Sequence, residues 1–263
     1  MDRLLQSLGQ SIVDDSGVTT KDPRRSSTTM ILTPAAQHAP DATRRLLRPS
    51  GSAPPFGIPM PTIVESILDR EDKRLWRARG AISAALGQSR GIVIISSLND
   101  DASIGEVTAG LAAGLILSER RPLLLLDLEY PAHTLQRIIG YASDLGLPDV
   151  LRGRFGLAEV TASCRDPRVG FLGGGTREPS LSELGSLKSG EIMVELVQIF
   201  DLVMAALPPG DNGVTEVLAS AASALGVKVF VIVLMEQENP ARLAHFSSMV
   251  ELAGGKVLGW VLA

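Results

Sequence analysis

The stretch GIVIISSLNDDASIGEVTAGLAAGL, residues 91–115, decides the fold. Its apolar, β-branched run at 92–95 predicts a buried strand, which a loop of small and polar residues follows. A helix rich in alanine, leucine and glycine comes next. A phosphate-binding loop has this order of strand, loop and helix. However, this loop carries Asp100, Asp101 and Glu106 where a phosphate loop presents a lysine and bare backbone N–H groups.

The composition is typical of a globular α/β protein. The chain has 263 residues, of which 45% are hydrophobic, with a formal net charge of −4 and a single cysteine, Cys164. The weak charge predicts no general attraction to nucleic acid or anionic lipid. No apolar run reaches the ~20 residues that cross a bilayer. One cysteine rules out an internal disulfide framework. We therefore expect a soluble, cytoplasmic protein.

Two regions differ in composition. Residues 1–61 hold eight of the sixteen prolines among Ser, Thr, Ala and Arg, and predict a disordered tail. Residues 62–263 predict one globular domain. A helical periodicity runs from Pro61 to a stop at Gly87. Further strands are expected at 91–96, 122–127, 169–172, 201–206, 227–235 and 256–262, and further helices at 106–119, 132–139, 180–199, 213–224 and 239–253. The alternation predicts a three-layer α/β fold whose mainly parallel sheet is flanked by helices.

The order of these signals resembles the cytoplasmic kinase domain of bacterial tyrosine kinases (BY-kinases) of capsule and exopolysaccharide export. Those kinases are relatives of the deviant P-loop ATPases of the MinD and ParA type. The resemblance runs from about residue 65 to the C-terminus. It rests on EDKRLWR (71–77), PLLLLDLEYPAHTLQRIIG (122–140), GLPDVLRG (146–153), GGGTREPSLSELGS (173–186), FDLVMAALPPG (200–210) and KVLGWVLA (256–263).

The residues that bind ATP and Mg²⁺ in such a domain are missing from these stretches. A P-loop places a lysine on the phosphate oxygens and a hydroxyl on Mg²⁺. The lysine position falls on Ile104, Gly105 or Glu106 in three alternative alignments, and no lysine occurs between Lys73 and Lys188. The resemblance implies a metal-binding acid at the end of strand 201–206, where Ala206 stands instead. The residues Asp101, Ser103, Ile104, Gly105 and Glu106 are therefore interpreted as a vestigial loop, in which each carboxylate ~4 Å from a phosphate would cost about 4 kcal/mol.

Two acids remain at the end of strand 122–127. The resemblance implies that Asp127 and Glu129 would position a hydroxyl and a metal in an active relative. Pro131 replaces the arginine expected after them, and we interpret both acids as vestigial or structural. His38, His133 and His245 lack metal-ligand spacing. Trp76 and Trp260 are expected in the core or in an interface, and Cys164 is not expected to be a nucleophile.

The sequence therefore predicts a catalytically inactive, tyrosine-kinase-like protein that needs no cofactor. It would be a binding or regulatory module in exopolysaccharide biosynthesis and export. The resemblance implies an inner-membrane co-polymerase or export protein, or an active relative, as partner. It also implies a homo-oligomer bridged by Glu71, Arg74 and Arg77, which share one helix face. One alternative is an atypical autokinase or ATPase that binds ATP and Mg²⁺. Another is a ParA- or MinD-like positioning protein.

Overall fold

The computed structural model describes residues 73–99, 104–141, 143–164, 166–210, 213–236 and 239–262. The predicted tail, 1–61, and the first part of the helix predicted from Pro61 lie outside the described residues. The division of the chain at residue 61 therefore stays a prediction.

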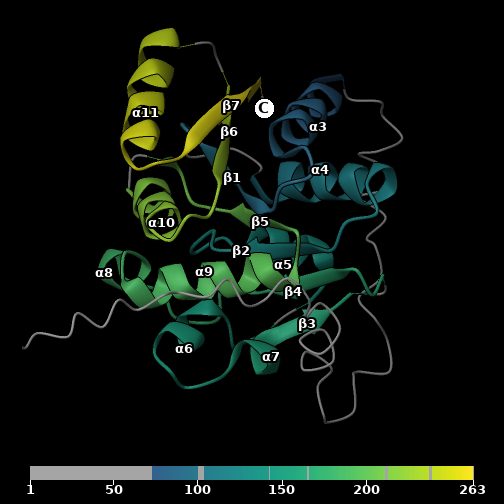
Figure 1. Ribbon diagram of the computed structural model, residues 1–263, viewed down its shortest axis with the longest axis vertical. Helices are drawn as coiled ribbons and strands as arrows, with labels where there is room; N and C mark the ends of the chain where they lie inside the picture. Colours follow the sequence, from purple (N-terminus) through teal and green to yellow (C-terminus); the bar gives the residue numbers. More distant parts are fainter. Residues whose placement is uncertain are drawn as a thin grey trace, which may run out of the picture. The chain divides into compact units, whose positions relative to one another are not determined.

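Seven strands form one sheet in the order β3-β4-β2-β5-β1-β6-β7 (Figure 1). The strands are β1 (Gly91–Ser97), β2 (Leu123–Asp127), β3 (Thr161–Ser163), β4 (Val169–Leu172), β5 (Leu202–Ala206), β6 (Val229–Met235) and β7 (Lys256–Leu262). All neighbours are parallel except β3 and β4, which are antiparallel. The predicted α/β class with a mainly parallel sheet is confirmed.

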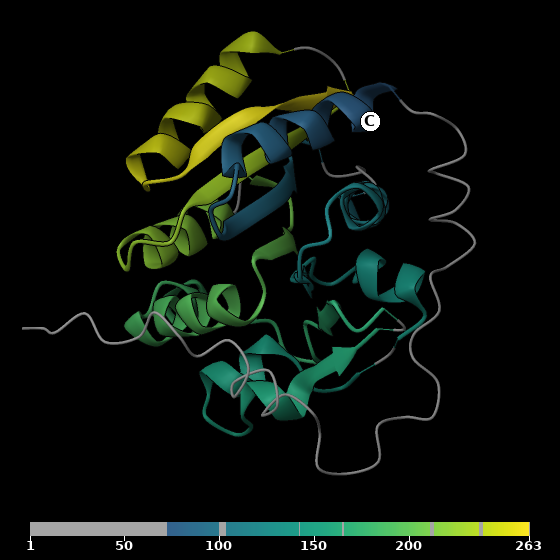
Figure 2. The same ribbon diagram turned by 45° about the vertical axis from the view of Figure 1, so that its right-hand side comes forward.

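Nine helices surround the sheet in the described part of the chain. They are α3 (Lys73–Leu86), α4 (Ile104–Ser118), α5 (Thr134–Ile139), α6 (Leu147–Leu151), α7 (Leu157–Val160), α8 (Leu181–Leu184), α9 (Leu187–Ile199), α10 (Val214–Ser223) and α11 (Pro240–Leu252). Helices α3 to α5 cover one face of the sheet and α6 to α11 the other (Figures 1 and 2).

The strands are apolar throughout because both faces of the sheet are covered. In β1, Ile92 and Ile94 pack into the core beneath α6 to α11, whereas Val93 and Ile95 pack into the core beneath α3 to α5. This alternation follows from the two-residue period of a strand. In the described part of the chain, no helix combines the length and the apolar character needed to cross a membrane.

Three local predictions need correction. The single helix expected over 180–199 is two helices: α8 ends at Leu184 with Gly185 as its C-cap, and Ser186 caps α9 by accepting the Ser189 N–H. Strand β3 was not predicted, since its three residues carry no apolar pattern. Helices α6 and α7 are too short to show a helical period, and they were also not predicted.

Candidate functional site

The candidate site lies where three parallel strands end side by side. Ile95 of β1 is in register with Ala206 of β5, and Ala206 is in register with Asp127 of β2. Helix α4 begins after the loop that leaves β1. In open α/β sheets, ligands bind outside the carboxyl ends of the strands, so this edge is where a bound group would sit.

The first turn of α4 offers no cationic group. Ile104 and Gly105 are buried, and Glu106 is exposed to solvent. The predicted loop residues Asp100, Asp101 and Ser103 lie outside the described residues. Ahead of them, the buried hydroxyl of Ser96 donates to the Pro208 carbonyl at 3.0 Å, and that of Ser97 donates to the Asn99 carbonyl at 2.8 Å. Both hydroxyls are therefore engaged by the backbone.

Gly105 allows α4 and α5 to meet backbone to backbone. A Cβ at this position would lie 2.4 Å from the Leu135 nitrogen and 2.7 Å from the Thr134 carbonyl carbon. No real Cβ makes contacts that short, so residue 105 must be glycine at this separation. Gly105 occupies the lost lysine position in one of the three alternative alignments, and in the structure it has a packing role of its own.

Asp127, at the end of β2, caps helix α5 although it lies nine residues before Gln136 in the sequence. Its carboxylate is fully buried and accepts the Gln136 N–H at 2.7 Å and the Glu129 N–H at 3.1 Å. His133 precedes α5 in a left-handed conformation and provides no side-chain cap. Asp127 supplies the missing acceptor for the free N–H groups at the start of the helix. Burial raises the pKa of Asp127, and the two backbone N–H groups oppose that rise.

Glu129 joins β2, α4 and α5. Its carboxylate is only 7% exposed and accepts a hydrogen bond from the Thr134 hydroxyl. Burial, with the nearby charge of Asp127, raises the pKa of Glu129 to about 7, while Thr134, Arg137 and the Gly105 N–H act in the opposite direction. The carboxylate thus approaches the N-terminal turn of α4, where a helix attracts negative charge.

Neither acid belongs to a metal-ligand cluster. No group of three or more histidine, cysteine, aspartate or glutamate side chains in the described part of the chain is arranged to hold a metal ion. The nearest imidazole is that of His133, whose Nδ1 lies 3.9 Å from Asp127 Oδ1 and has no hydrogen bond. The arrangement favours the structural interpretation of Asp127 and Glu129.

Ala206 provides no ligand at the end of β5. Its side chain is fully buried, and its carbonyl accepts the Leu128 N–H at 2.8 Å. The position that the resemblance assigns to a metal-binding acid is therefore a methyl group enclosed between β1 and β2. Asp201 lies at the opposite end of β5 and forms a 3.0 Å ion pair with Arg90. Asp211 lies outside the described residues.

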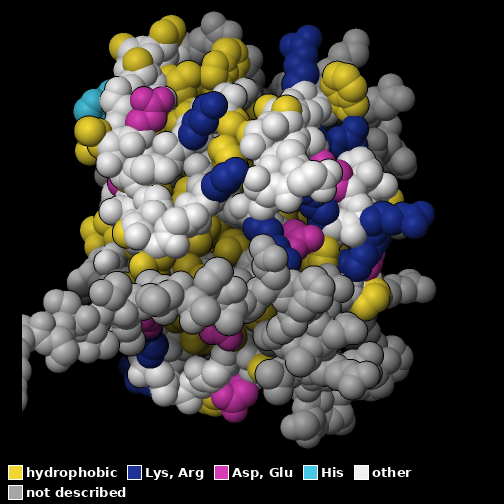
Figure 3. All heavy atoms as spheres, viewed as in Figure 1, with side chains coloured by type: hydrophobic (Ala, Val, Ile, Leu, Met, Phe, Trp, Pro, Cys, Tyr) yellow, Lys and Arg dark blue, Asp and Glu magenta, His cyan; other side chains and the backbone are white. Residues whose placement is uncertain are grey.

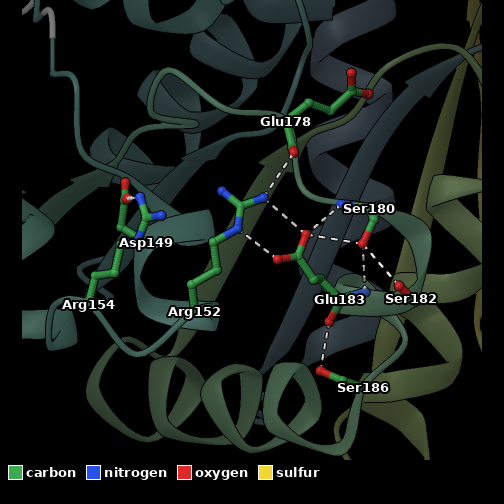
Figure 4. A network of polar contacts seen from close by, with 8 residues as sticks. All are labelled: Asp149, Arg152, Arg154, Glu178, Ser180, Ser182, Glu183 and Ser186. Atoms are coloured by element: carbon green, nitrogen blue, oxygen red, sulfur yellow. Dashed lines mark hydrogen bonds and ion pairs between the residues drawn. The ribbon is translucent and has the colours of Figure 1, made fainter.

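A second polar network joins the turn after α6 to the segment that leads into α8 (Figure 4). Arg152 donates from Nε and Nη2 to the two carboxylate oxygens of Glu183, at 2.7 and 3.0 Å, and also from Nη2 to the Glu178 carbonyl. This fork holds the pKa of Glu183 down at about 2. Glu183 also accepts the N–H of Ser180, the residue that caps α8. The pairing ties the turn after α6 to the start of α8.

The remaining predicted residues lie away from this edge. The pKa of the half-buried Cys164 is raised by burial to about 12, so its thiol stays neutral and poorly nucleophilic. Trp76 and Trp260 are 66% and 41% exposed, so neither lies in the core, and the predicted interface role stays a prediction. Arg74 and Arg77 lie on α3 and Arg77 is exposed, whereas Glu71 lies outside the described residues.

Sequence reasoning missed the partners that fix the two acids. Thr134 and His133 carry no signal that links them to Asp127 or Glu129, because both contacts depend on how the chain turns after β2. The same turn places Tyr130 so that its hydroxyl donates to the Gly174 carbonyl. The only local hint was the glycine at 105, since glycine inside a helix often marks a close backbone contact.

The strand order and the helices on both faces define an α/β domain with a mainly parallel sheet. Comparison with solved structures agrees. The chimerical protein CapA2B2 matches with a TM-score of 0.59 and 19% identity over 70% of this chain and 80% of its own. The VpsO kinase domain matches with a TM-score of 0.55 and 20% identity over 73% and 97%. The kinase domain of the Escherichia coli tyrosine kinase ETK matches with a TM-score of 0.55 and 16% identity over 65% and 66%.

These likenesses are low in identity and establish the fold alone. No protein-family model matches the chain, and no curated protein matches its sequence. The shared architecture agrees with the predicted resemblance to tyrosine kinase domains.

Proposed function

We propose that this protein is a catalytically inactive relative of the bacterial tyrosine kinases that acts as a binding module in exopolysaccharide biosynthesis and export. It would act in the cytoplasm, at the inner membrane only through a partner, and without ATP or a metal. Its partner would be the membrane co-polymerase or export protein, or an active relative.

The observation that carries this proposal is the buried methyl group of Ala206 in register with Asp127. Phosphoryl transfer needs Mg²⁺ held beside the phosphates and a cation on their oxygens. Ala206 cannot bind a metal, and Asp127 already accepts two backbone N–H groups. Ile104, Gly105 and Glu106 provide no cation at the start of α4. Several independent substitutions would be needed to restore the chemistry.

Calorimetric titration with ATP tests the inactive state. We expect no heat of binding at sub-millimolar ATP with excess Mg²⁺, and no autophosphorylation. Glu106→Lys should leave both results unchanged, because residue 206 still supplies no acid. Micromolar, Mg²⁺-dependent binding to the wild-type protein would overturn the proposal and favour an atypical ATPase or kinase.

Assembly is tested separately through α3. Arg77 is exposed, and arginine pairs well with a carboxylate of another subunit through its planar fork. The combined changes Glu71→Ala, Arg74→Ala and Arg77→Ala should lower the oligomer mass in light scattering and leave the far-UV spectrum unchanged. A wild-type protein that stays monomeric at high concentration would contradict the proposed homo-oligomer.

A further inference from the structure

A groove of about 390 Å³ lies between α3 and β7, away from the edge described above. Arg77, Ala78 and Ala81 form its helix side, and Leu258, Gly259 and Trp260 contribute to its sheet side. The lining is mainly apolar, with one guanidinium at the rim. The groove therefore combines a hydrophobic floor with a positive charge.

The groove borders an unpaired strand edge. Strand β7 is the last strand of the sheet and pairs only with β6 within the described part of the chain. Figure 2 shows β7 (yellow) running beside α3 (blue) at the border of the sheet. Natural edge strands usually carry charges or proline that block further pairing. In KVLGWVL, the only charged residue is Lys256 at the first position, and there is no proline. The edge is therefore suited to strand addition.

Gly259 leaves a hollow in the middle of this edge strand. A Cβ built on Gly259 meets no atom within 4 Å, and its backbone does not require a glycine. Gly105, in contrast, is enclosed by backbone atoms. The hollow opens beside the groove, where an apolar side chain of an added strand has room.

The charged residues of the two described elements that form the groove, α3 and β7, are all positive. Every charged residue of α3 is a lysine or an arginine, and the positive end of the helix dipole adds to them. No hydrogen bond or ion pair joins the Arg77 guanidinium to another described residue. Lys256 is exposed at the start of β7. Figure 3 shows several Lys and Arg side chains on this side of the molecule, with Asp and Glu side chains between them. An incoming segment that carries carboxylates complements this surface.

We propose that the outer edge of β7 and the adjoining groove bind an extended, acidic segment of a partner protein, which adds to the sheet as a further strand. Its backbone pairs with β7, an apolar side chain enters the hollow at Gly259, and a carboxylate pairs with Arg77. The inference rests on the proposed binding function and names the chemistry of the partner segment. It uses Arg77 in protomers that this residue does not bridge to another subunit.

Tryptophan fluorescence tests the proposal in the full-length protein. The chain has two tryptophans, of which Trp260 lies at the groove, and Trp76→Phe isolates its signal. The probe is a capped octapeptide of alternating glutamate and valine. We expect saturable binding with a blue shift of the Trp260 emission, weakened by salt. A lysine–valine octapeptide should not bind.

Three variants separate the proposed contacts from general charge effects. Gly259→Leu fills the hollow and Arg77→Glu reverses the rim charge, so each should weaken binding at least tenfold. Lys188→Glu makes the same charge change at an exposed residue of α9, away from the groove, and should bind like the wild type. Gly259→Ala gives a smaller loss if the leucine variant does not fold.

Three outcomes would overturn the proposal. In the first, the lysine–valine peptide binds as tightly as the glutamate–valine peptide. In the second, both Gly259 variants bind the glutamate–valine peptide as tightly as the wild type does. In the third, the wild-type protein is a dimer that Gly259→Leu converts to a monomer. The last would assign the edge to a second copy of the chain. ATP binding, in contrast, would overturn the proposed inactive state without changing the peptide result.

Discussion

Asp127 and Ala206 stand in register at the ends of β2 and β5, so a buried carboxylate has a buried methyl group as its strand neighbour. The buried carboxylate is accommodated by hydrogen bonds within the fold. Asp127 is held by backbone N–H groups, and Ala206 adds no second charge that a cation would have to neutralise.

Ala206→Asp should destabilise the protein and should not create a nucleotide site. A new carboxylate would be buried beside Asp127 without a counter-ion, at a cost of about 3 kcal/mol or more. Urea unfolding at pH 8 measures the loss. Ala206→Asn, which has the same size without the charge, is the control and should lose less. Recovery of the aspartate variant by Mg²⁺ and ATP would show that a working site had been restored.

Glu129→Gln should flatten the pH dependence of stability. The pKa of Glu129 rises from its ordinary 4.5 to about 7 on folding, so the native state binds the proton more tightly. The stability that this proton contributes is fully present below about pH 4.5 and is lost as the pH rises through about 7. The variant should therefore exceed the wild type in stability at pH 8, but not at pH 4.5.

The comparison requires urea unfolding at both pH values. Glutamine still accepts the Thr134 hydroxyl hydrogen bond, so the packing is retained. Asp127 interacts with Glu129, so the difference between the two proteins reports the titration of the pair. Glu106→Gln removes an exposed carboxylate from the nearby turn of α4 and should behave as the wild type. An identical pH profile for Glu129→Gln and the wild type would contradict the role of burial.

Gly105→Ala and Gly80→Ala should have opposite effects although both lie in helices. At 105 the new methyl group meets backbone of α5, and the strain should cost about 1–3 kcal/mol. At 80 nothing lies within 4 Å, and alanine should stabilise α3 by about 0.5–1 kcal/mol. Thermal unfolding of both variants measures the contrast. Equal shifts in the same direction would show that α4 and α5 separate freely.

Arg152→Lys should lower the melting temperature because lysine cannot reproduce the two-pronged contact with Glu183. A loss of about 1 kcal/mol corresponds to about 2–4 °C in a domain of this size. Since the pKa of Glu183 is lowered to about 2, its contribution is present above about pH 4.5 and is lost as the pH falls through about 2. The difference between the two proteins should therefore shrink in acid, and a constant difference would contradict the ion pair.

The sequence carried most of the fold because its strands are continuous apolar runs. Strand β4 and strand β7 were predicted with the bounds that the structure has, 169–172 and 256–262. Strand β3 was not predicted because its formation depends on pairing with β4 and not on its own composition. The split between α8 and α9 depends on the side-chain cap of Ser186, a weaker signal than the apolar period around it.

The candidate site was located from the sequence, but its internal contacts were not. The strand pattern placed Asp127 and Ala206 at the ends of their strands, and the family resemblance marked both of them and Glu129 as site positions. The partners of the two acids come from α5 and α4, and their distances depend on the turn at His133, whose left-handed backbone no local pattern predicted. The exposure of Trp76 and Trp260 likewise depends on which strand ends the sheet.

The distant cap that Asp127 provides for α5 has an evolutionary consequence. The chain needs an acceptor at this position to start the helix, with or without catalysis. Selection for folding alone would then keep an aspartate at 127 long after any catalytic demand had ended. An aspartate at position 127 is therefore weak evidence of catalysis, because folding alone is enough to conserve it.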